Sequence, residues 1–343
     1  MKYIQPIQII GTQRSGSNML RLMLNQFDEI SAPHPPHILQ RFVPLLPLYG
    51  DLENISNFND LVNDVCELVE RNPVPWTGVN FDRSEITARC KNRTLIEIFK
   101  VIYDLKAESD NASFWVCKSM DNVKYATELE SSGMNMFYIY LYRDGRDVAC
   151  SFKKAIVGEK HVYHIANQWA SNQLACFDLK HKIESGRFLT VSYENLLQHP
   201  KKEMKRISSF LNISFKKEVF NFYHSEESKN TAIAGKMWEN VSRPILKNNT
   251  NKYKVELTPL EIAIFEKQAG QILCQLGYST DNTGILNGAP FTEMQLHEFN
   301  NENKLLKEKA EKSVDPEGMK LREKQESLLK QIREKNKREV SYY

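Results

Sequence analysis

The segment "YIQPIQIIGTQRSGSNMLRLMLNQ", residues 3–26, restricts what this chain can fold into more than any other stretch. An apolar run ends at Gly11, a turn of small residues follows, and the sequence then resumes with helical spacing. A strand, a phosphate-binding loop and a helix have this pattern. The segment therefore predicts a loop that holds a phosphate group after the first strand.

The rest of the chain alternates between strand-like and helical segments. Strand-like runs occupy residues 4–10, 114–118, 136–142 and 188–192. Such alternation predicts an α/β fold with a central parallel sheet and helices on both of its faces. The helices with the clearest spacing are expected at residues 17–27, 121–131, 145–155, 163–183, 201–211 and 258–276.

Two segments extend this plan. A helical insertion of about residues 35–112 either covers the open edge of the sheet or only completes the core. Residues 1–280 would form one domain, followed by a charged, mainly helical C-terminal extension, residues 281–343. We expect one or two solvated helices there, broken at Asp315-Pro316; a homo-oligomer formed through these helices is the alternative.

Charge and cysteine usage exclude several classes of protein. The formal charge of +3 comes from residues 300–343, where 12 Lys and Arg stand against 9 Asp and Glu, so the body is balanced. A balanced body gives no reason to expect nucleic acid as a partner. Six isolated cysteines predict buried free thiols in a reducing compartment. Because no apolar run has the form of a signal peptide or the length of a membrane span, we expect a cytoplasmic protein.

The loop lacks the lysine of an ATP-binding P-loop. Gly11 is followed by four residues, Gly16 and then Ser17, which stands where that lysine would be, while Arg14 lies inside the loop. Backbone N–H groups of residues 15–18 could still bind a phosphate. Magnesium chemistry loses its support, and we expect no metal site.

Two motifs together resemble the sulfotransferases that use 3′-phosphoadenosine 5′-phosphosulfate, PAPS. "GTQRSGSNML" is similar to their 5′-phosphosulfate loop, and their fold resembles that of P-loop NTPases. In "YIYLYRDGRDVACSFKKA", Arg143 ends a strand and Ser151 follows eight residues later. An Arg there offers a planar fork to a phosphate. The resemblance implies that Arg143 and Ser151 bind the 3′-phosphate, and that the loop binds the other end of the donor through Arg14, Ser15, Gly16, Ser17 and Asn18. For Arg143 taken alone, an ion pair with a neighbouring Asp would be favoured, but the loop and the spacing to Ser151 together favour phosphate binding.

A lysine after the second strand completes the donor side. Lys118 in "FWVCKSMDN" ends a strand, where parallel sheets place their ligands. A family lysine at this place contacts the bridging oxygen and the sulfonate, which implies a catalytic role for Lys118. Met120 stands where some family members have a catalytic His, so the base must come from elsewhere.

The segment "SAPHPPHILQRF" offers two candidates for that base. A neutral imidazole suits removal of a proton from a hydroxyl near pH 7. Family members often place a catalytic Glu about twenty residues beyond the loop Arg, which favours His34, with His37 second. A structural role for either histidine remains open.

Three further matches are less specific. Tyr193 in "VSYENLLQ" either lies near the adenine or belongs to the core. Lys252 in a Lys-Tyr pair matches a family lysine that reaches the nucleotide, with Trp238 as a weaker candidate. Trp76 and Phe81 could line an acceptor cleft or belong to the core. The resemblance covers about residues 4–278.

The resemblance implies a PAPS-dependent sulfotransferase that needs no metal and releases adenosine 3′,5′-bisphosphate. The acceptor would be a hydroxyl of a carbohydrate, lipid, phenol or peptide. One alternative is a degenerate P-loop kinase or NTPase; the other is a non-catalytic nucleotide-binding assembly protein of the same fold.

Overall fold

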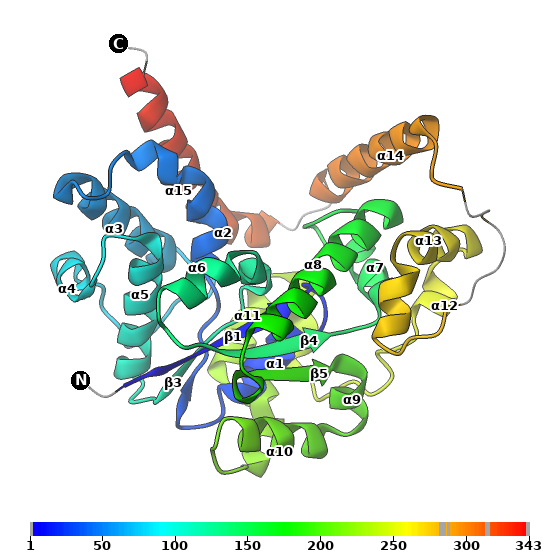
Figure 1. Ribbon diagram of the computed structural model, residues 1–343, viewed down its shortest axis with the longest axis horizontal. Coiled ribbons are helices and arrows are strands. Elements are labelled where there is room, and N and C mark those ends of the chain that lie inside the picture. The colour runs from blue at the N-terminus through cyan, green and yellow to red at the C-terminus, as the bar shows by residue number, and fades with distance from the viewer. Residues whose placement is uncertain (1–2, 281–285, 287–288, 313–315, 341–343) are drawn as a thin grey trace.

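The central sheet is parallel throughout. The computed structural model describes residues 3–280, 286, 289–312 and 316–340 (Figure 1). Within them, one five-stranded sheet has the order β2-β3-β1-β4-β5, and all neighbouring strands run parallel. This confirms the predicted α/β class. The strands are β1 (Gln5–Gly11), β2 (Ile30–Ser31), β3 (Phe114–Cys117), β4 (Phe137–Tyr142) and β5 (Phe188–Ser192).

Side chains on the two faces of the sheet enter separate hydrophobic cores. In β4, Tyr138 and Tyr140 point into one core, whereas Ile139 and Leu141 point into the other. Successive residues of a strand face opposite ways, so a strand covered on both faces reads as a continuous apolar run. That is why the run "MFYIYLY" could be identified as a buried strand.

The helices on the two faces are close to those expected. One side carries α8 (Val162–Lys182), and the other carries α1 (Ser17–Leu24) and α10 (Pro200–Phe210). The expected helix at 121–131 is divided into η2, a 3-10 helix, and α6. The remaining elements of this part are η2 (Met120–Tyr125), α6 (Ala126–Ser131), α7 (Gly145–Lys154), η3 (Ser185–Arg187), α9 (Tyr193–Gln198), η4 (Lys217–His224), α11 (Glu226–Ile233), η5 (Lys236–Ser242), α12 (Tyr253–Glu256) and α13 (Pro259–Gln275).

The insertion is helical, as predicted, and packs beside β2 and β3. Its helix α5 (Leu95–Ser109) contacts both strands, and Trp76 and Phe81 belong to the core beneath it. The insertion therefore combines the two predicted roles. It packs on the edge strand β2, and it completes the hydrophobic core. Its other elements are α2 (Ile38–Phe42), η1 (Val43–Tyr49), α3 (Ile55–Glu70) and α4 (Arg83–Arg89).

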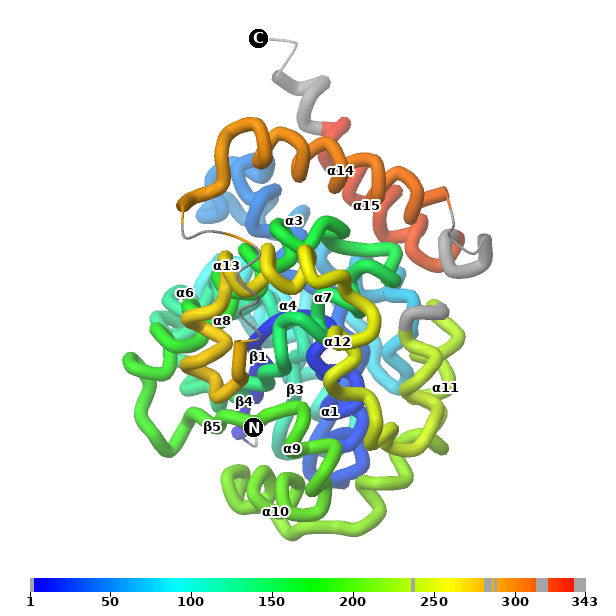
Figure 2. The backbone as a smooth tube through the Cα atoms, turned by 90° about the vertical axis from the view of Figure 1, so that its right-hand side faces the viewer, coloured from blue at the N-terminus to red at the C-terminus, as the bar shows by residue number. Residues whose placement is uncertain are grey.

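The C-terminal extension forms α14 (Glu293–Lys312) and α15 (Pro316–Val340) on one side of the molecule (Figures 1 and 2). Asp315 of the expected break lies outside the described residues. The expectation of solvated helices is wrong for α15, because Leu328, Leu329 and Ile332 are buried in the core that contains the insertion. Association of copies through these helices stays a prediction.

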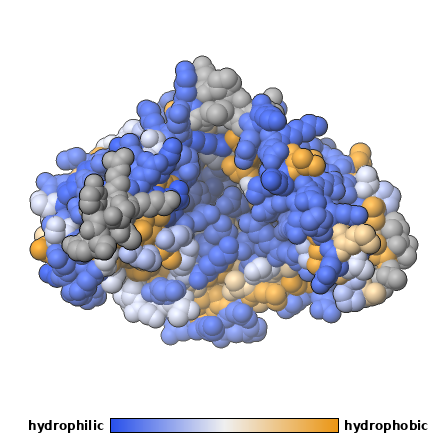
Figure 3. Space-filling view, turned by 90° about the horizontal axis from the view of Figure 1, so that it is seen from above, coloured by the Kyte–Doolittle hydropathy of each residue, from blue (hydrophilic) through white to orange (hydrophobic). Residues whose placement is uncertain are grey.

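The face of the molecule that carries α14 and α15 has a hollow between the two helices, and hydrophilic residues predominate in this hollow (Figure 3). Among the described residues, no helix combines the length and the apolar character needed to cross a membrane. All six cysteines are free thiols, but the expectation that they are buried is wrong for Cys274, which is exposed, and Cys90 is half-buried. Cys90 is the C-cap residue of α4, and Cys274 lies in the last turn of α13.

Candidate active site

Each strand of the sheet leads at its carboxyl end to one of the predicted site residues. Lys118, Arg143 and Tyr193 directly follow β3, β4 and β5. Arg14 follows β1 and His34 follows β2, each after a short turn. Because the strands are parallel, these ends meet at one edge, which is where open α/β sheets bind ligands. The sequence predicts the strand ends at Arg14, Lys118, Arg143 and Tyr193, whereas it places His34 after the first helix and does not predict β2.

The geometry of the loop after β1 requires two glycines. Gly11 has φ 128°, and a Cβ there would lie 2.3 Å from the carbonyl oxygen of Leu141. Gly16 has φ 85°, and its Cβ would lie 2.3 Å from a ring carbon of Tyr193. Arg14 also has a positive φ of 70°. Glycine is the residue that accepts both this conformation and such close approaches, so the loop can fold tightly against β4 and Tyr193.

The loop and the Arg143 motif are in direct contact. Nε of Arg14 donates a hydrogen bond to Oγ of Ser151 on α7 at 3.0 Å. Nη1 of Arg143 donates to the backbone carbonyl of Arg14 at 3.1 Å. Two segments about 130 residues apart in sequence thus form one cationic surface at the end of the sheet.

Arg143 is oriented by three neighbours. Its guanidinium lies 4.5 Å from the ring centre of Tyr193, and Nη2 donates to the carbonyl of Asn249 at 2.8 Å. The Asn249 side chain in turn donates to the Tyr193 hydroxyl at 2.6 Å. Asp147 Oδ2 lies 3.6 Å from Arg143 Nη2, so the ion pair considered for this Arg is also present. Lys252, by contrast, is exposed, and its role in binding stays a prediction.

Several buried polar atoms at this edge have no hydrogen-bond partner within the described residues. Three of them can donate a hydrogen bond, namely Oγ of Ser15, Oγ of Ser119 and Nε of Arg143, and one, Oδ2 of Asp147, is an acceptor. Ser17 and Asn18 begin α1 immediately behind them, after a glycine N-cap with no side-chain cap. Buried polar groups are nearly always paired in native proteins, so a group of orphans around a helix N-terminus indicates a site for an anionic ligand.

Lys118 is buried beside the loop, with a depressed pKa. Burial and the positive charges of Arg21 and Arg14 lower the pKa of its ammonium to about 7. The pKa of Arg14 is likewise lowered to about 10, by burial and by Arg143. Met120 is buried, with its methyl 3.2 Å from where a Cβ of Gly11 would stand, so it packs against the loop.

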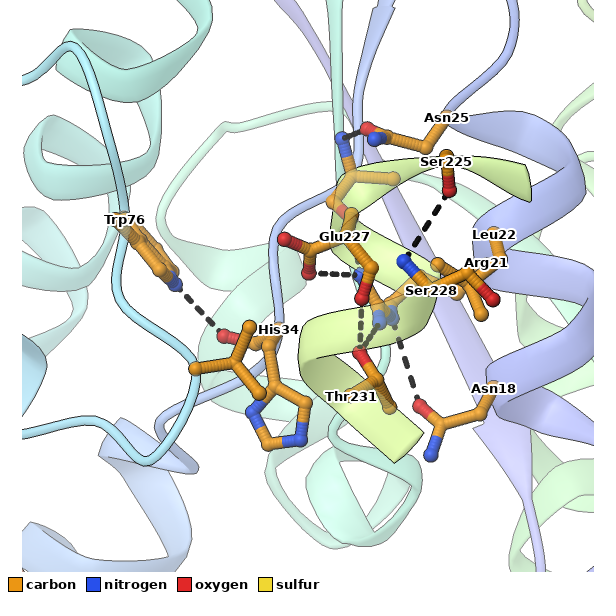
Figure 4. A network of polar contacts seen from close by, with 12 residues as sticks. Asn18, Arg21, Leu22, Asn25, His34, Trp76, Ser225, Glu227, Ser228 and Thr231 are labelled. Carbon is orange, nitrogen blue, oxygen red and sulfur yellow. Dashed lines mark hydrogen bonds and ion pairs between the residues drawn. The ribbon is translucent and has the colours of Figure 1, made fainter. Parts of the chain in front are cut away.

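His34 is fixed by its own backbone carbonyl (Figure 4). That carbonyl accepts hydrogen bonds from Nε1 of Trp76 at 2.7 Å and from Nδ2 of Asn72 at 3.0 Å. Nδ1 of the ring lies 3.3 Å from Asn72 Nδ2, and the ring meets Trp238 edge-on at 5.2 Å between centres. Nε2 is buried and has no partner among the described residues. Nδ1 of the imidazole thus lies near Asn72, whereas Nε2 makes no hydrogen bond within the described residues and could accept a proton.

Both histidines of the segment are neutral at pH 7. Burial, together with the charges of Arg21 and Lys118, holds the pKa of His34 well below its usual value. Burial and the charges of Lys118 and Arg41 lower the pKa of His37 to about 3. His37 has φ 59° and is the N-cap residue of α2. A neutral imidazole is the form that can accept a proton.

The profile of the sulfotransferase family matches residues 6–217, which is more than half of the chain. The chain belongs to the sulfotransferase family. It is similar in structure to the sulfotransferase domain from the curacin biosynthetic pathway, with 20% identity and a TM-score of 0.55 over 81% of this chain and 99% of that domain. The sulfotransferase domain of the Synechococcus PCC 7002 olefin synthase matches with 20% identity and a TM-score of 0.56, over 81% of this chain and 97% of that domain. At such identities the likeness shows the fold. No curated protein sequence matches the chain.

This sulfotransferase also uses a buried arginine that sequence reasoning missed. Arg21 of α1 donates to the carbonyl of Ala32 at 2.7 Å, to Glu227 at 2.7 Å and to Thr231 at 3.0 Å (Figure 4). It therefore ties α1 to α11 and to the segment that carries His34. The available signal was a charged residue one helical turn after Ser17, on the apolar face of the first helix.

Proposed function

We propose that this sulfotransferase transfers the sulfonate group of PAPS to an acceptor hydroxyl of a carbohydrate, lipid, phenol or peptide. The observation that carries this proposal is the contact between the two predicted halves of the donor site. Arg14 of the loop donates to Ser151, and Arg143 donates to the carbonyl of Arg14. A kinase-type site gives no role to the Arg143 and Ser151 pair.

The residues present fit an anionic donor. Arg143 and Ser151 would hold the 3′-phosphate, while the N–H groups of residues 15–18 would hold the 5′ side. Lys118 and Arg14 would offset charge on the leaving phosphate. The buried orphan atoms of Ser15 and Arg143 are the places where new acceptor oxygens are needed. When bound, PAPS supplies an activated sulfonate group.

His34 is the first candidate for the base, and His37 is the second. Nε2 of His34 is unpaired within the described part of the chain, and its imidazole is neutral. In the free enzyme, burial and the charges of Arg21 and Lys118 lower the pKa of His34 and make it a weak base. Negative charge brought by the donor would offset those charges and raise the pKa of His34, so that the base gains strength when the donor is in place.

Calorimetric binding of adenosine 3′,5′-bisphosphate, compared with ADP with and without Mg²⁺, tests the donor site. We expect metal-independent binding of the bisphosphate and a loss of roughly 10- to 100-fold in Arg143→Ala, the effect of one charged hydrogen-bonding group. Ser151→Ala should weaken binding less. Arg187→Ala is the matched control, because Arg187 pairs with Glu130 at the opposite end of β5.

Each result decides between the named functions. Preference for ADP with Mg²⁺ would establish a kinase-type nucleotide site and refute the proposal. The protein could instead bind the bisphosphate but transfer no labelled sulfonate from PAPS to a carbohydrate, lipid, phenol or peptide hydroxyl. That result would favour the non-catalytic alternative. Equal losses in Arg143→Ala and Arg187→Ala would show a general effect on folding instead of a phosphate contact.

A further inference from the structure

The C-terminal helix α15 reaches the neighbourhood of the predicted base. The guanidinium of Arg322 lies 5.3 Å from the ring centre of Trp238. The same Trp238 ring contacts His34 at 5.2 Å between centres. A Cβ on Gly235 would lie only 3.0 Å from Nη2 of Arg322, so this strand-like turn fits closely against the guanidinium. One side chain therefore separates the extension from the base.

Arg322 has unused hydrogen-bonding capacity. Its Nη2 is buried and has no partner within the described residues. A buried guanidinium N–H without an acceptor is unfavourable, and an anionic ligand would supply that acceptor. The guanidinium lies over the Trp238 ring, and its planar set of N–H donors matches the oxygens of a carboxylate, phosphate or sulfate.

The surroundings of Arg322 carry an excess of positive charge. Burial and the charge of Arg41 lower the pKa of Arg322. The charges of Lys118 and Arg41 both act on His37, in addition to its burial. Glu326 of α15 pairs with Arg41 at 3.0 Å, but it is largely exposed. The cations therefore continue from the donor side, past the two histidines, to α15.

We propose that α15 completes the acceptor side of the site and that Arg322, with Arg41, selects an acceptor that carries an anionic group near its hydroxyl. This inference rests on the proposed function. The acceptor hydroxyl would lie at His34, and its carboxylate, phosphate or sulfate would lie at Arg322. Arg322 is thus a specificity residue supplied by a segment outside the residues matched by the family profile.

Quenching of tryptophan fluorescence by iodide tests the anion site without knowledge of the acceptor. Trp115 and Trp169 are fully buried and Trp76 is nearly so, which makes Trp238 the main accessible tryptophan. In Arg322→Gln we expect the iodide quenching constant to fall about two- to fourfold at low salt, because one nearby charge is lost. Quenching by neutral acrylamide should not change. Lys330→Gln is the matched control, because Lys330 is an exposed cation on the same helix.

Matched acceptors test the selection itself. Transfer of labelled sulfonate is measured to 4-hydroxybenzoate and 6-hydroxyhexanoate, each beside its uncharged methyl ester. We expect the wild type to prefer the carboxylates in kcat/KM, and Arg322→Gln to lose that preference about tenfold. Adenosine 3′,5′-bisphosphate binding should be the same in both proteins.

The outcomes separate this inference from the proposed function. Unchanged iodide quenching in Arg322→Gln, or equal use of carboxylates and esters by the wild type, would overturn the inference while bisphosphate binding is retained. If none of these acceptors reacts, the iodide quenching result alone decides whether Arg322 forms an anion site. Loss of bisphosphate binding from the wild type itself would instead refute the proposed function.

Discussion

At the scale of single residues, the proposed function predicts that donor binding depends on the charge of Lys118 and therefore on pH. The ammonium has a pKa of about 7 because burial and two arginines disfavour its charged form. A lowered pKa means that the charge is present below about pH 7 and is lost above it. We therefore expect affinity for adenosine 3′,5′-bisphosphate to fall as pH rises from 7 to 9, by up to about tenfold per unit.

The matched variant for this prediction is Lys118→Arg, whose guanidinium stays charged over the whole range. Its affinity, measured by calorimetry at the same pH values, should stay nearly level. Parallel pH profiles for the two proteins would mean that Lys118 is not the group that titrates.

At the same scale, the proposed function gives His34 the role of the base in the chemical step. His34→Gln keeps the carbonyl that Trp76 and Asn72 hold, and it removes the proton acceptor. We expect kcat for sulfonate transfer to fall roughly 10²- to 10⁴-fold, the usual contribution of a general base, while bisphosphate affinity is unchanged. His37→Gln is the comparison. Full turnover in His34→Gln with loss of turnover in His37→Gln would transfer the role to His37.

At the scale of secondary-structure elements, the sequence predicts where the long strands end. It does not predict the shortest strand or the contacts between distant elements. Arg14, Lys118, Arg143 and Tyr193 follow strands that are long and apolar enough to be identified from the sequence. Parallel topology then brings their ends together without further information. By contrast, β2 has two residues, Ile30–Ser31, and no pattern of period two can be detected over that length.

The missed contacts join distant parts of the chain. Asn249 holds both Arg143 and Tyr193 from a loop "NNTN" whose composition indicates only a turn. Arg21 reaches α11, which begins about 200 residues later. Such partners depend on tertiary packing, so a single sequence carries no local sign of them. The three buried apolar residues of α15, Leu328, Leu329 and Ile332, do have the spacing of one helix face. They are few among many Lys and Glu, which is why the sequence favours a solvated helix.

At the scale of the whole molecule, the extension connects two sides of the structure (Figures 1 and 2). On α14, Oδ1 of Asn303 accepts hydrogen bonds from the backbone N–H groups of Lys160 at 2.8 Å and His161 at 3.0 Å, in the loop after α7. On α15, Nε2 of Gln325 donates to the carbonyl of Leu68 of α3 at 2.7 Å. The extension thus contacts both the loop between α7 and α8 and helix α3 of the insertion.

This arrangement predicts that α15 contributes to global stability. Leu329 is 3% exposed and belongs to the main core, so Leu329→Ala should lower the free energy of unfolding by about 2 to 5 kcal/mol. Leu305→Ala on α14 is the control, because Leu305 is 65% exposed and should change that free energy by less than about 0.5 kcal/mol. Urea unfolding followed by circular dichroism measures both. Equal, small changes would mean that α15 detaches in solution, and Arg322 would then have no fixed place beside Trp238. A large loss confined to Leu329→Ala would show that the helix carrying Arg322 unfolds only with the rest of the sulfotransferase.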